Sequence, residues 1–399
     1  MSHALIVEAL RSPRGRGNDK GALRNLKPVD LLAQQLEALA SRTLIQTAQV
    51  SDVYMGCVTQ TADQGANIAK LALIKAGWDD CVPGLSINRY CASGLSAVHM
   101  AAQEAMSCDS LAVGGGIEMM SRVPMASDKG PLTHDFEFQS QTGLIPIGIA
   151  ADVIATQEGF SRQLCDDYAL ASQQRAVAAR DRGHTRAMTE VHDETGAVLL
   201  AQDETPRANT SLDSLAAIQP AFAAMAEKYG IDKLMCHRYG LSKIDHVQHA
   251  GNSPAMADGA SAVLVASPDA AQRAGLKARA KILATATVSA DRTLALTGAV
   301  QATQQALARA KLKVDDIDLF EVNESFACLM LHYMKHLNVP HHKLNVNGGA
   351  IALGHAMGST GSALIGVVLD ELERTDQRRA VVALCGAAGL AVAMVIERI

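Results

Sequence analysis

The order of expected strands and helices near the start of the chain returns near its end. The paired segments are 52–58 with 318–322, 86–91 with 344–355, and 111–116 with 381–386. A spacing of roughly 260 residues in every pair indicates an internal duplication. Because strands alternate with helices in each copy, the sequence predicts two related α/β units that pack as pseudo-symmetric partners.

A segment that neither copy repeats separates them. Its clearest feature is an expected helix with Ser161 as N-cap and Gly183 as stop, and with Leu164, Tyr168 and Ala171 on one apolar face. At 399 residues the chain is also too long for one simple core. We expect three parts: an N-terminal α/β unit of residues 1–123 plus 247–272, an inserted domain of residues 124–246, and a C-terminal α/β unit of residues 273–399.

Charge and cysteine content narrow the class of protein. The net charge of -5 gives no reason to expect nucleic acid or an anionic membrane as a partner. The eight cysteines include no CxxC pair, which argues against a zinc site and a disulfide framework and fits a reducing cytoplasm. The N-terminal apolar run is too short for a signal peptide, no stretch reaches the length of a membrane span, and the final ERI is no peroxisomal address. We therefore expect a cytoplasmic protein.

Three reactive side chains stand at expected turns. Cys91 follows a short strand-like run and precedes a helix of small residues, and the N-terminus of a helix favours a thiolate over a thiol. The alternative for Cys91 alone is a buried structural cysteine. His355 lies in a glycine-rich turn, and Cys385 lies in the turn after an apolar strand. Two thiols and an imidazole are the groups needed for nucleophilic acyl transfer with proton shuttling.

The chain resembles the thiolases in four segments that follow the family's order and spacing. They are NRxCxSGL around Cys91, NExFA at Asn323 to Ala327, NVNGGAIALGH ending at His355, and the cysteine turn at Cys385. The resemblance runs from IVEALRSPRGR to MVIER, nearly the whole chain. It implies the five-layer αβαβα thiolase fold, with the site between two duplicated α/β units. The insertion would be a loop domain that covers the site, binds coenzyme A (CoA) and helps subunits associate, as a homodimer or homotetramer.

The resemblance also implies a role for each reactive group. Cys91 is expected to be the nucleophile that takes the acyl group, and His355 the base that activates it and later donates to the thioester oxygen. Cys385 would move the proton at Cα of the acetyl unit. Asn323 would hold a water that forms the first oxyanion hole with His355, and backbone N–H groups at Cys91 and in the Cys385 turn would form the second.

Expected CoA contacts are less regular than the catalytic motifs. They are Ser253, Arg207, Gln219 and the backbone N–H of Ala387. Gln219 stands where relatives commonly have Arg or Lys near the CoA phosphates, and Ser253 stands one place before the usual serine position, which Pro254 holds. Relatives usually carry glycine in the turn of Ala387, so its N–H is presented only if φ stays negative or strain is tolerated.

Other departures concern loops. Ala356 replaces a usual proline and Ser325 a usual alanine, and we expect both to alter packing without removing a functional atom. Between Phe222 and Gly251 there are roughly twenty more residues than the family usually has. Two interpretations of this segment stay open: a solvated surface hairpin, or a replacement clamp for the CoA phosphates. Its basic residues are Lys228, Lys233, His237, Arg238 and Lys243.

Two further patterns are expected to carry no ligand. His332 and His336 lie four residues apart on an expected helix, and His341 and His342 follow. No acidic residue completes an H-E-x-x-H motif, so we expect surface or interface histidines and no metal site. The run Gly114-Gly115-Gly116 lacks the spacing of a dinucleotide loop, and it fits close packing of the duplicated units.

The resemblance implies an acetyl-CoA C-acyltransferase without metal or permanently bound cofactor, with CoA esters such as acetyl-CoA as substrates. In fatty-acid β-oxidation, a 3-oxoacyl-CoA and CoA would give acetyl-CoA and a shortened acyl-CoA through an acyl group on Cys91. Alternatives are biosynthetic condensation of two acetyl-CoA, a ketoacyl synthase, which usually has a second histidine where Asn323 stands, and a non-catalytic acyl-CoA-binding relative. Arg89 favours the 3-oxoacyl type, because acetoacetyl-forming relatives more often have lysine there.

The acyl pocket is expected to be roomy. Acetoacetyl-CoA members of the family close it with a His-Met pair just before a glycine. Here Pro146 and Ile147 precede Gly148, and Ala295 replaces a second pocket methionine. An apolar, larger pocket predicts a preference for 3-oxohexanoyl-CoA and longer substrates over acetoacetyl-CoA.

Overall fold

The computed structural model describes residues 3–183 and 186–399. The strands of its large mixed sheet are β1 (Leu5–Arg11), β2 (Gly15–Arg16), β3 (Val50–Gly56), β4 (Leu85–Ile87), β5 (Leu111–Met119), β8 (Ala257–Ala266), β9 (Ala280–Ser289), β10 (Leu319–Val322), β11 (Arg379–Cys385) and β12 (Leu390–Arg398). They lie in the order β10-β11-β12-β9-β1-β8-β5-β3-β4, with β2 paired to β8 beside this path. β6 (Val191–His192) and β7 (Val198–Leu200) form a separate pair.

The two halves of the sheet repeat one arrangement. In the N-terminal half β3 is parallel to β5, and β5 is antiparallel to β8, which is antiparallel to β1. In the C-terminal half β10 is parallel to β11, and β11 is antiparallel to β12, which is antiparallel to β9. The halves meet where Leu5 and Ile6 pair with Lys281 and Ala280. The internal duplication read from the sequence is thus present in the order and direction of the strands.

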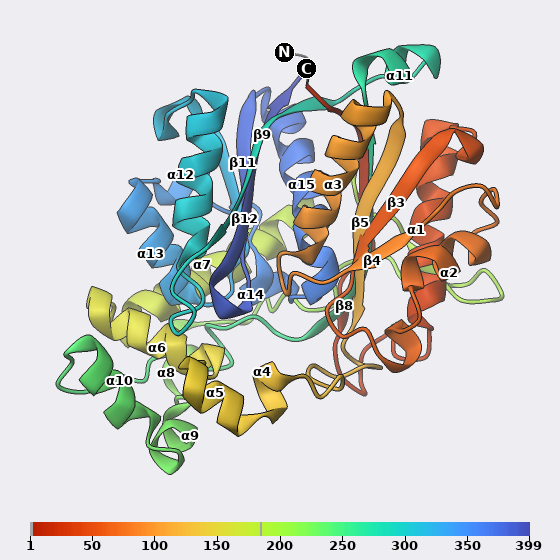
Figure 1. Cartoon of the computed structure of the whole chain (residues 1–399). Helices are drawn as coiled ribbons and strands as arrows, with labels where there is room; N and C mark the ends of the chain where they lie inside the picture. Colours follow the sequence, from red (N-terminus) through yellow and green to blue (C-terminus); the bar gives the residue numbers. More distant parts are fainter. Residues whose placement is uncertain (1–2, 184–185) are drawn as a thin grey trace.

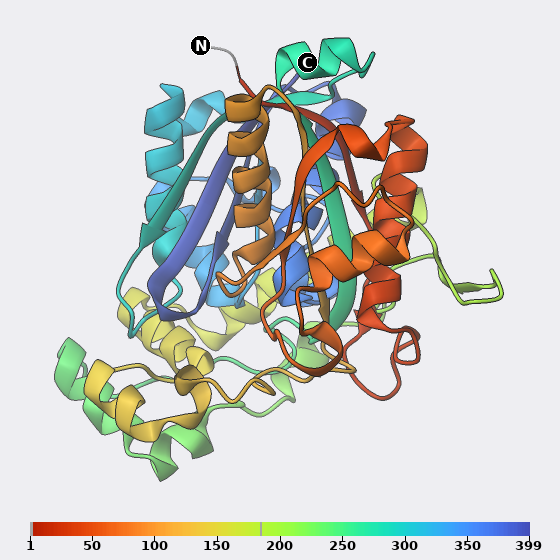
Figure 2. The same cartoon turned by 45° about the vertical axis from the view of Figure 1, so that its right-hand side comes forward.

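Helices complete the layers. α1 (Pro28–Thr43) and α2 (Ile68–Lys75) cover the N-terminal half, while α12 (Gly298–Ala310) and α13 (Ala327–Leu337) cover the C-terminal half. α3 (Ser93–Cys108) and α15 (Met357–Thr375) pack against each other between the halves, as Figures 1 and 2 show. Separate apolar cores lie on the two outer sides and around the central helices. Outer helices, sheet halves and central helices thus form five layers, the arrangement that the resemblance to the thiolases implies.

Glycines let the central helices approach the sheet. A Cβ at Gly114 in β5 would lie 2.4 Å from the Cα of Val98 in α3, and one at Gly116 would lie 2.1 Å from the carbonyl oxygen of Gly358 in α15. Neither position has room for a side chain. The glycine run therefore serves close packing inside a strand, as expected.

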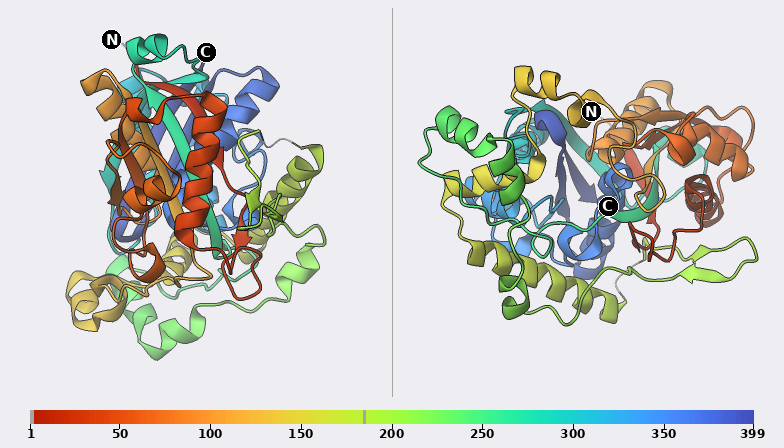
Figure 3. Two further views of the ribbon diagram at one scale, coloured as in Figure 1. Left: turned by 90° about the vertical axis from the view of Figure 1, so that its right-hand side faces the viewer. Right: turned by 90° about the horizontal axis from the view of Figure 1, so that it is seen from below.

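Most of the segment between β5 and β8 lies at the lower end of the molecule in Figure 1 and in the left view of Figure 3, where its longest helix rises along one side. None of the helices in the described residues is long and apolar enough to cross a membrane. The inserted helices are α4 (Pro131–His134), α5 (Phe136–Thr142), α6 (Ile147–Glu158), α7 (Arg162–Arg182), α8 (Leu212–Ala216), α9 (Ala223–Lys228) and α10 (Ile231–Tyr239).

The two ends of α7 lie where the sequence predicts them, but its buried face includes different residues from those expected. Ser161 accepts a hydrogen bond from the Leu164 backbone N–H, and Gly183 ends the helix with φ 73°. Leu164 was expected on the apolar face, yet it is 46% exposed. The buried stripe follows Cys165, Tyr168, Ala169, Ser172 and Ala176, and Leu164 lies about 100° from the centre of this stripe on the helix.

Candidate active site

Cys91 lies partly exposed in the turn between β4 and α3. Tyr90, the residue before it, has φ 48°, a left-handed conformation that residues other than glycine rarely adopt. The Tyr90 backbone N–H donates to Oδ1 of Asn88 at 2.8 Å, and the Arg89 backbone N–H donates to Oγ of Ser93 at 2.7 Å. The Ser93 hydroxyl in turn donates to the Tyr90 carbonyl at 2.6 Å. The turn's own hydrogen bonds therefore hold Cys91 at the start of α3.

Two opposing effects act on the pKa of the Cys91 thiol, and burial is the larger one. Burial raises the pKa of the Cys91 thiol to about 12, and the nearby Cys385 and Glu118 raise it further against a lowering by a backbone N–H. The loss of water outweighs the N–H groups of the helix end, which favour the thiolate. Cys91 therefore rests as a thiol and needs a base.

His355 supplies a base in a defined tautomer. It lies between α14 (Ala350–Leu353) and α15, with Nδ1 2.9 Å from Oγ1 of Thr360. The Thr360 hydroxyl donates its only proton to the Ala356 carbonyl at 2.9 Å. Thr360 must then accept from Nδ1–H, which leaves the lone pair on Nε2. This Nε2 is buried and has no hydrogen-bond partner among the described residues.

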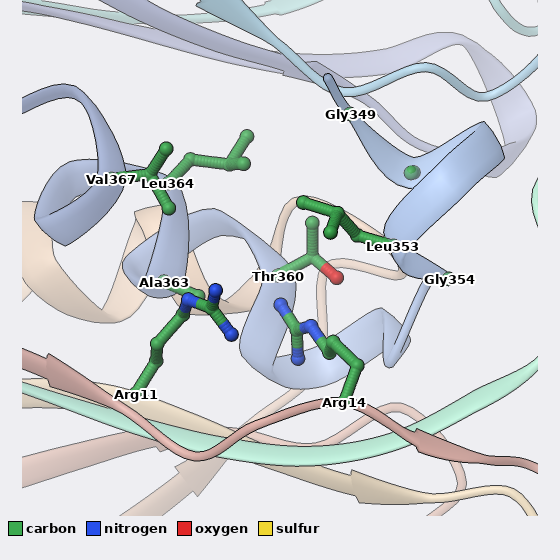
Figure 4. Close-up of a pocket in the computed structure, with 10 residues that line it drawn as sticks. Arg11, Arg14, Gly349, Leu353, Gly354, Thr360, Ala363, Leu364 and Val367 are labelled. Carbon is green, nitrogen blue, oxygen red and sulfur yellow. The ribbon is translucent and has the colours of Figure 1, made fainter. Parts of the chain in front are cut away.

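The surroundings of His355 keep it neutral. Burial lowers its pKa to about 3, and the charge of Arg14 acts in the same direction. In Figure 4 Arg11, Arg14 and Thr360 surround a cavity of about 20 Å³ beside α15. Arg11 is paired with Asp203 at 2.7 Å, whereas Nη1 of Arg14 donates to a neutral hydroxyl. A neutral imidazole with a free Nε2 is the state that a general base requires.

Cys385 ends β11 as part of a hydrogen-bonded chain. Its Sγ lies 3.1 Å from Oγ of Ser325, and Nδ2 of Asn323 donates to the same Oγ at 3.0 Å. Burial raises the pKa of Cys385 to about 11, against a lowering by Ser325. Oδ1 of Asn323 is buried without a partner among the described residues. Ser325, expected to alter packing, thus also adds a hydroxyl that links the two expected catalytic residues.

The turns that carry the reactive groups meet at one end of the central helices. A Cβ at Gly386 would lie 3.3 Å from the Arg89 carbonyl oxygen, so the turns of Cys385 and Cys91 face each other. Three residues after His355, the Gly358 carbonyl oxygen lies 2.7 Å from where a Cβ of Gly94 would stand. The starts of α3 and α15 are therefore in contact.

The turn after Cys385 carries strain at one alanine. Ala388 has φ 56°, and Gly389 follows with φ 84°. Ala387 lies outside the left-handed region and has a negative φ. The N–H of Ala387 is thus presented without strain at that residue, and the unfavourable conformation falls on its neighbour.

The expected CoA contacts do not form one cluster. Ser253 is half-buried, and its Oγ has no partner among the described residues. Gln219 is exposed. Arg207 is also exposed, and its backbone N–H donates to Oε1 of Gln173 in α7 at 2.8 Å. It lines a surface groove of about 270 Å³ beside α7, where none of the other expected site residues lies.

The extra segment after Phe222 is a pair of short helices, α9 and α10, and its five basic side chains are exposed. Its end is held by His246, whose ring lies 2.7 Å from Asp152 and 3.1 Å from Asp232. The hydrogen bond to Asp152 is the main reason why the pKa of His246 rises to about 9. The segment is therefore anchored by a charged histidine, a feature that its sequence pattern did not reveal.

An aromatic pair lies where the acyl pocket was expected. A Cβ at Gly148, at the start of α6, would lie 2.1 Å from the ring of Phe222. That ring meets Phe326 edge to face, with centroids 6.1 Å apart. Ile147 is 37% exposed and Ala295 is buried. The sequence indicated the small residues, but it did not indicate that Phe222 would cover Gly148.

Comparisons with known proteins agree with this geometry. Residues 4–228 match the family model described as thiolase, N-terminal domain, and residues 276–398 match thiolase, C-terminal domain. The 3-ketoacyl-CoA thiolases of Serratia proteamaculans and Aliivibrio fischeri are 36% and 35% identical to this chain, over 100% of each protein. The crystal structure of the Bacillus anthracis acetyl-CoA acetyltransferase is 28% identical, with a TM-score of 0.86 over 100% of this chain and 99% of that chain. The chain belongs to the thiolase family.

Proposed function

We propose that this thiolase cleaves 3-oxoacyl-CoA with CoA, through an acyl group carried by Cys91. The observation that carries the proposal is a neutral His355 whose Nε2 has no partner among the described residues, at the start of a helix that contacts the helix of Cys91. Full-length similarity to proteins named 3-ketoacyl-CoA thiolase supports the degradative direction.

In the first half-reaction Nε2 of His355 takes the Cys91 proton, and the thiolate attacks the 3-oxo carbon. The bond between Cα and this carbon breaks, so the acetyl-CoA enolate leaves and the shortened acyl group stays on Cys91. Cys385 then gives its proton to Cα, which its raised pKa permits because the thiol is intact at neutral pH. The unpaired Oδ1 of Asn323 can hold a water against the oxyanion.

In the second half-reaction the Cys385 thiolate takes the proton of the incoming CoA thiol. The CoA sulfur attacks the thioester, and the shortened acyl-CoA leaves. Cys91 departs as a thiolate and recovers its proton from the His355 imidazolium. All groups return to their starting states, so the cycle needs no redox partner.

CoA binding and assembly are part of the same proposal. We assign CoA binding to four groups: Ser253, Arg207, Gln219 and the Ala387 N–H. The strongest support is that the buried Oγ of Ser253 has no hydrogen-bond partner among the described residues. We assign the protein to the cytoplasm, because its eight cysteines are free. We also assign it a homodimer, with a homotetramer as the next possibility. The support is that β4 is a terminal strand of the sheet and carries Leu85 at 43% exposure.

One experiment separates this enzyme from a non-catalytic acyl-CoA-binding relative. The protein is mixed with acetoacetyl-CoA, and its intact mass is measured with and without free CoA. We expect one added acyl group per chain that free CoA removes, and no added group in Cys91→Ser, which keeps its fold. An unmodified parent chain, or a Cys91→Ser variant with thiolysis within about tenfold of the parent, would overturn the proposal.

A further inference from the structure

Three potential metal donors outside the active site converge between two helices. Oε1 of Glu158, the last residue of α6, lies 2.9 Å from Nδ1 of His332 and 2.7 Å from Nε2 of His336, both on α13. The three ligand atoms all lie within 4.8 Å of one another. No acid on the helix of the histidines completes an H-E-x-x-H motif, whereas the fold supplies one from a residue 174 positions away in the chain.

We propose that Glu158, His332 and His336 bind a divalent first-row metal ion, with Zn²⁺ as the best match. Two imidazoles and a carboxylate, with water in the fourth position, form a donor set typical of zinc. Donors around a tetrahedral zinc lie roughly 3.3 Å apart, so the two nitrogen–oxygen contacts need to lengthen by only about 0.5 Å.

The site is accessible and nearly formed. The His336 side chain is 43% exposed, which gives an ion a path, while Glu158 and His332 are 15% and 12% exposed and are held by packing. The two rings already lie side by side, with centroids 4.1 Å apart. The ligand atoms of all three residues already lie within 4.8 Å of one another.

One neighbouring charge opposes the ion. Nζ of Lys335 lies 2.7 Å from Oε2 of Glu158, and the ammonium competes with a cation for the same carboxylate. The lysine side chain is 54% exposed, so it can swing into solvent when a metal binds. Removal of this charge should therefore strengthen metal binding.

The location gives the ion a structural role. α6 begins at the Gly148 position beneath Phe222, and α13 begins just after Ser325 and Phe326. An ion at the far end of α6 would fasten the inserted segment to the helix that follows a catalytic loop. It touches no reacting group, so kcat with metal bound should stay within about twofold of the metal-free value.

Titration calorimetry with zinc chloride on the full-length, metal-stripped protein tests the proposal. Because thiols at the active site also bind zinc, the measured quantity is the difference between parent and variant. We expect His336→Ala and Glu158→Gln each to lose one equivalent, or at least about tenfold in affinity, and His342→Ala, an exposed histidine on the next turn, to match the parent. Lys335→Met should bind more tightly than the parent.

A thermal melt gives an independent readout. Zinc at about a hundred times its Kd should raise the Tm of the parent by about 3 °C and leave that of His336→Ala unchanged. If parent and His336→Ala bind the same number of zinc ions with equal affinity, the proposal is wrong. The same holds if the metal-stripped parent binds no zinc.

Discussion

The hydroxyl of Ser325 lies 3.1 Å from the sulfur of Cys385, and it accepts a hydrogen bond from Asn323 at 3.0 Å. Since Asn323 occupies the oxygen as a donor, the serine proton is free to point at sulfur. A donor at sulfur stabilises the thiolate, in agreement with the lowering that Ser325 exerts on the pKa of Cys385. The Ser325 hydroxyl therefore lies where it would tune the proton transfer that we propose for Cys385.

Ser325→Ala should slow the proton step without preventing acylation. Loss of one hydrogen bond raises the pKa of Cys385 and costs about 1 kcal/mol, or roughly fivefold, in the exchange of acetyl-CoA α-protons with solvent. Deuterium exchange followed by NMR measures the rate, and intact mass measures acylation of Cys91. Exchange as fast as in the parent would show that the contact has no influence on Cys385.

Cys385→Ala should separate the two thiols more sharply. Cys91 can still be acylated by acetyl-CoA, because His355 and not Cys385 activates it, but α-proton exchange and condensation should fall at least about a hundredfold. Mass spectrometry and the exchange assay on the same sample give both numbers. A variant whose Cys91 no longer accepts the acetyl group would contradict this division of labour.

Thr360→Val tests the tautomer of His355. Valine keeps the shape but accepts no hydrogen bond, so the ring proton is no longer held on Nδ1 and less of the imidazole has a free Nε2. We expect kcat for thiolysis to fall about tenfold, while Thr360→Ser stays within about twofold of the parent. Equal rates for the valine and serine variants would remove Thr360 from the mechanism.

His246 should make stability depend on pH. Its pKa rises from 6.5 to about 9 in the folded protein, chiefly through Asp152, so the folded state binds a proton that the unfolded state releases. Its stabilising effect is complete below about pH 6.5 and is lost as pH rises through about 9. The Tm difference between the parent and His246→Asn should therefore shrink between pH 6 and about 9.5. A difference independent of pH would exclude a charged His246.

The sequence predicted what depends on local pattern. Motif spacing indicated Cys91, His355 and Cys385 as candidates, and the duplicated strand order predicted that their turns lie on facing units. The sequence did not reveal which residues from distant segments lie in contact. The acid beside His332 comes from α6, and the hydroxyl beside Cys385 comes from a residue 60 positions away in the chain.

The protonation states of the site residues could not be predicted from the sequence for a related reason. A helix end favours a thiolate at Cys91, but the burial that raises the pKa of this thiol depends on what the rest of the fold places around it. Likewise, the tautomer of His355 follows from where the Thr360 hydroxyl donates. Such effects require the folded chain.

The apolar lining of the expected acyl pocket should favour substrates with longer acyl chains. The expected acyl pocket lacks the histidine and methionines of the short-chain relatives, because Pro146, Ile147 and Ala295 stand at those positions. The rings of Phe222 and Phe326 provide an apolar surface beside Gly148. Each extra methylene buried in the transition state contributes about 0.8 kcal/mol, so two should raise kcat/KM roughly tenfold. We expect that advantage for 3-oxohexanoyl-CoA over acetoacetyl-CoA in parallel steady-state assays. Phe222→Ala should reduce it, because an emptied wall contacts the longer chain less; a parent that prefers acetoacetyl-CoA would instead favour the condensing, biosynthetic direction.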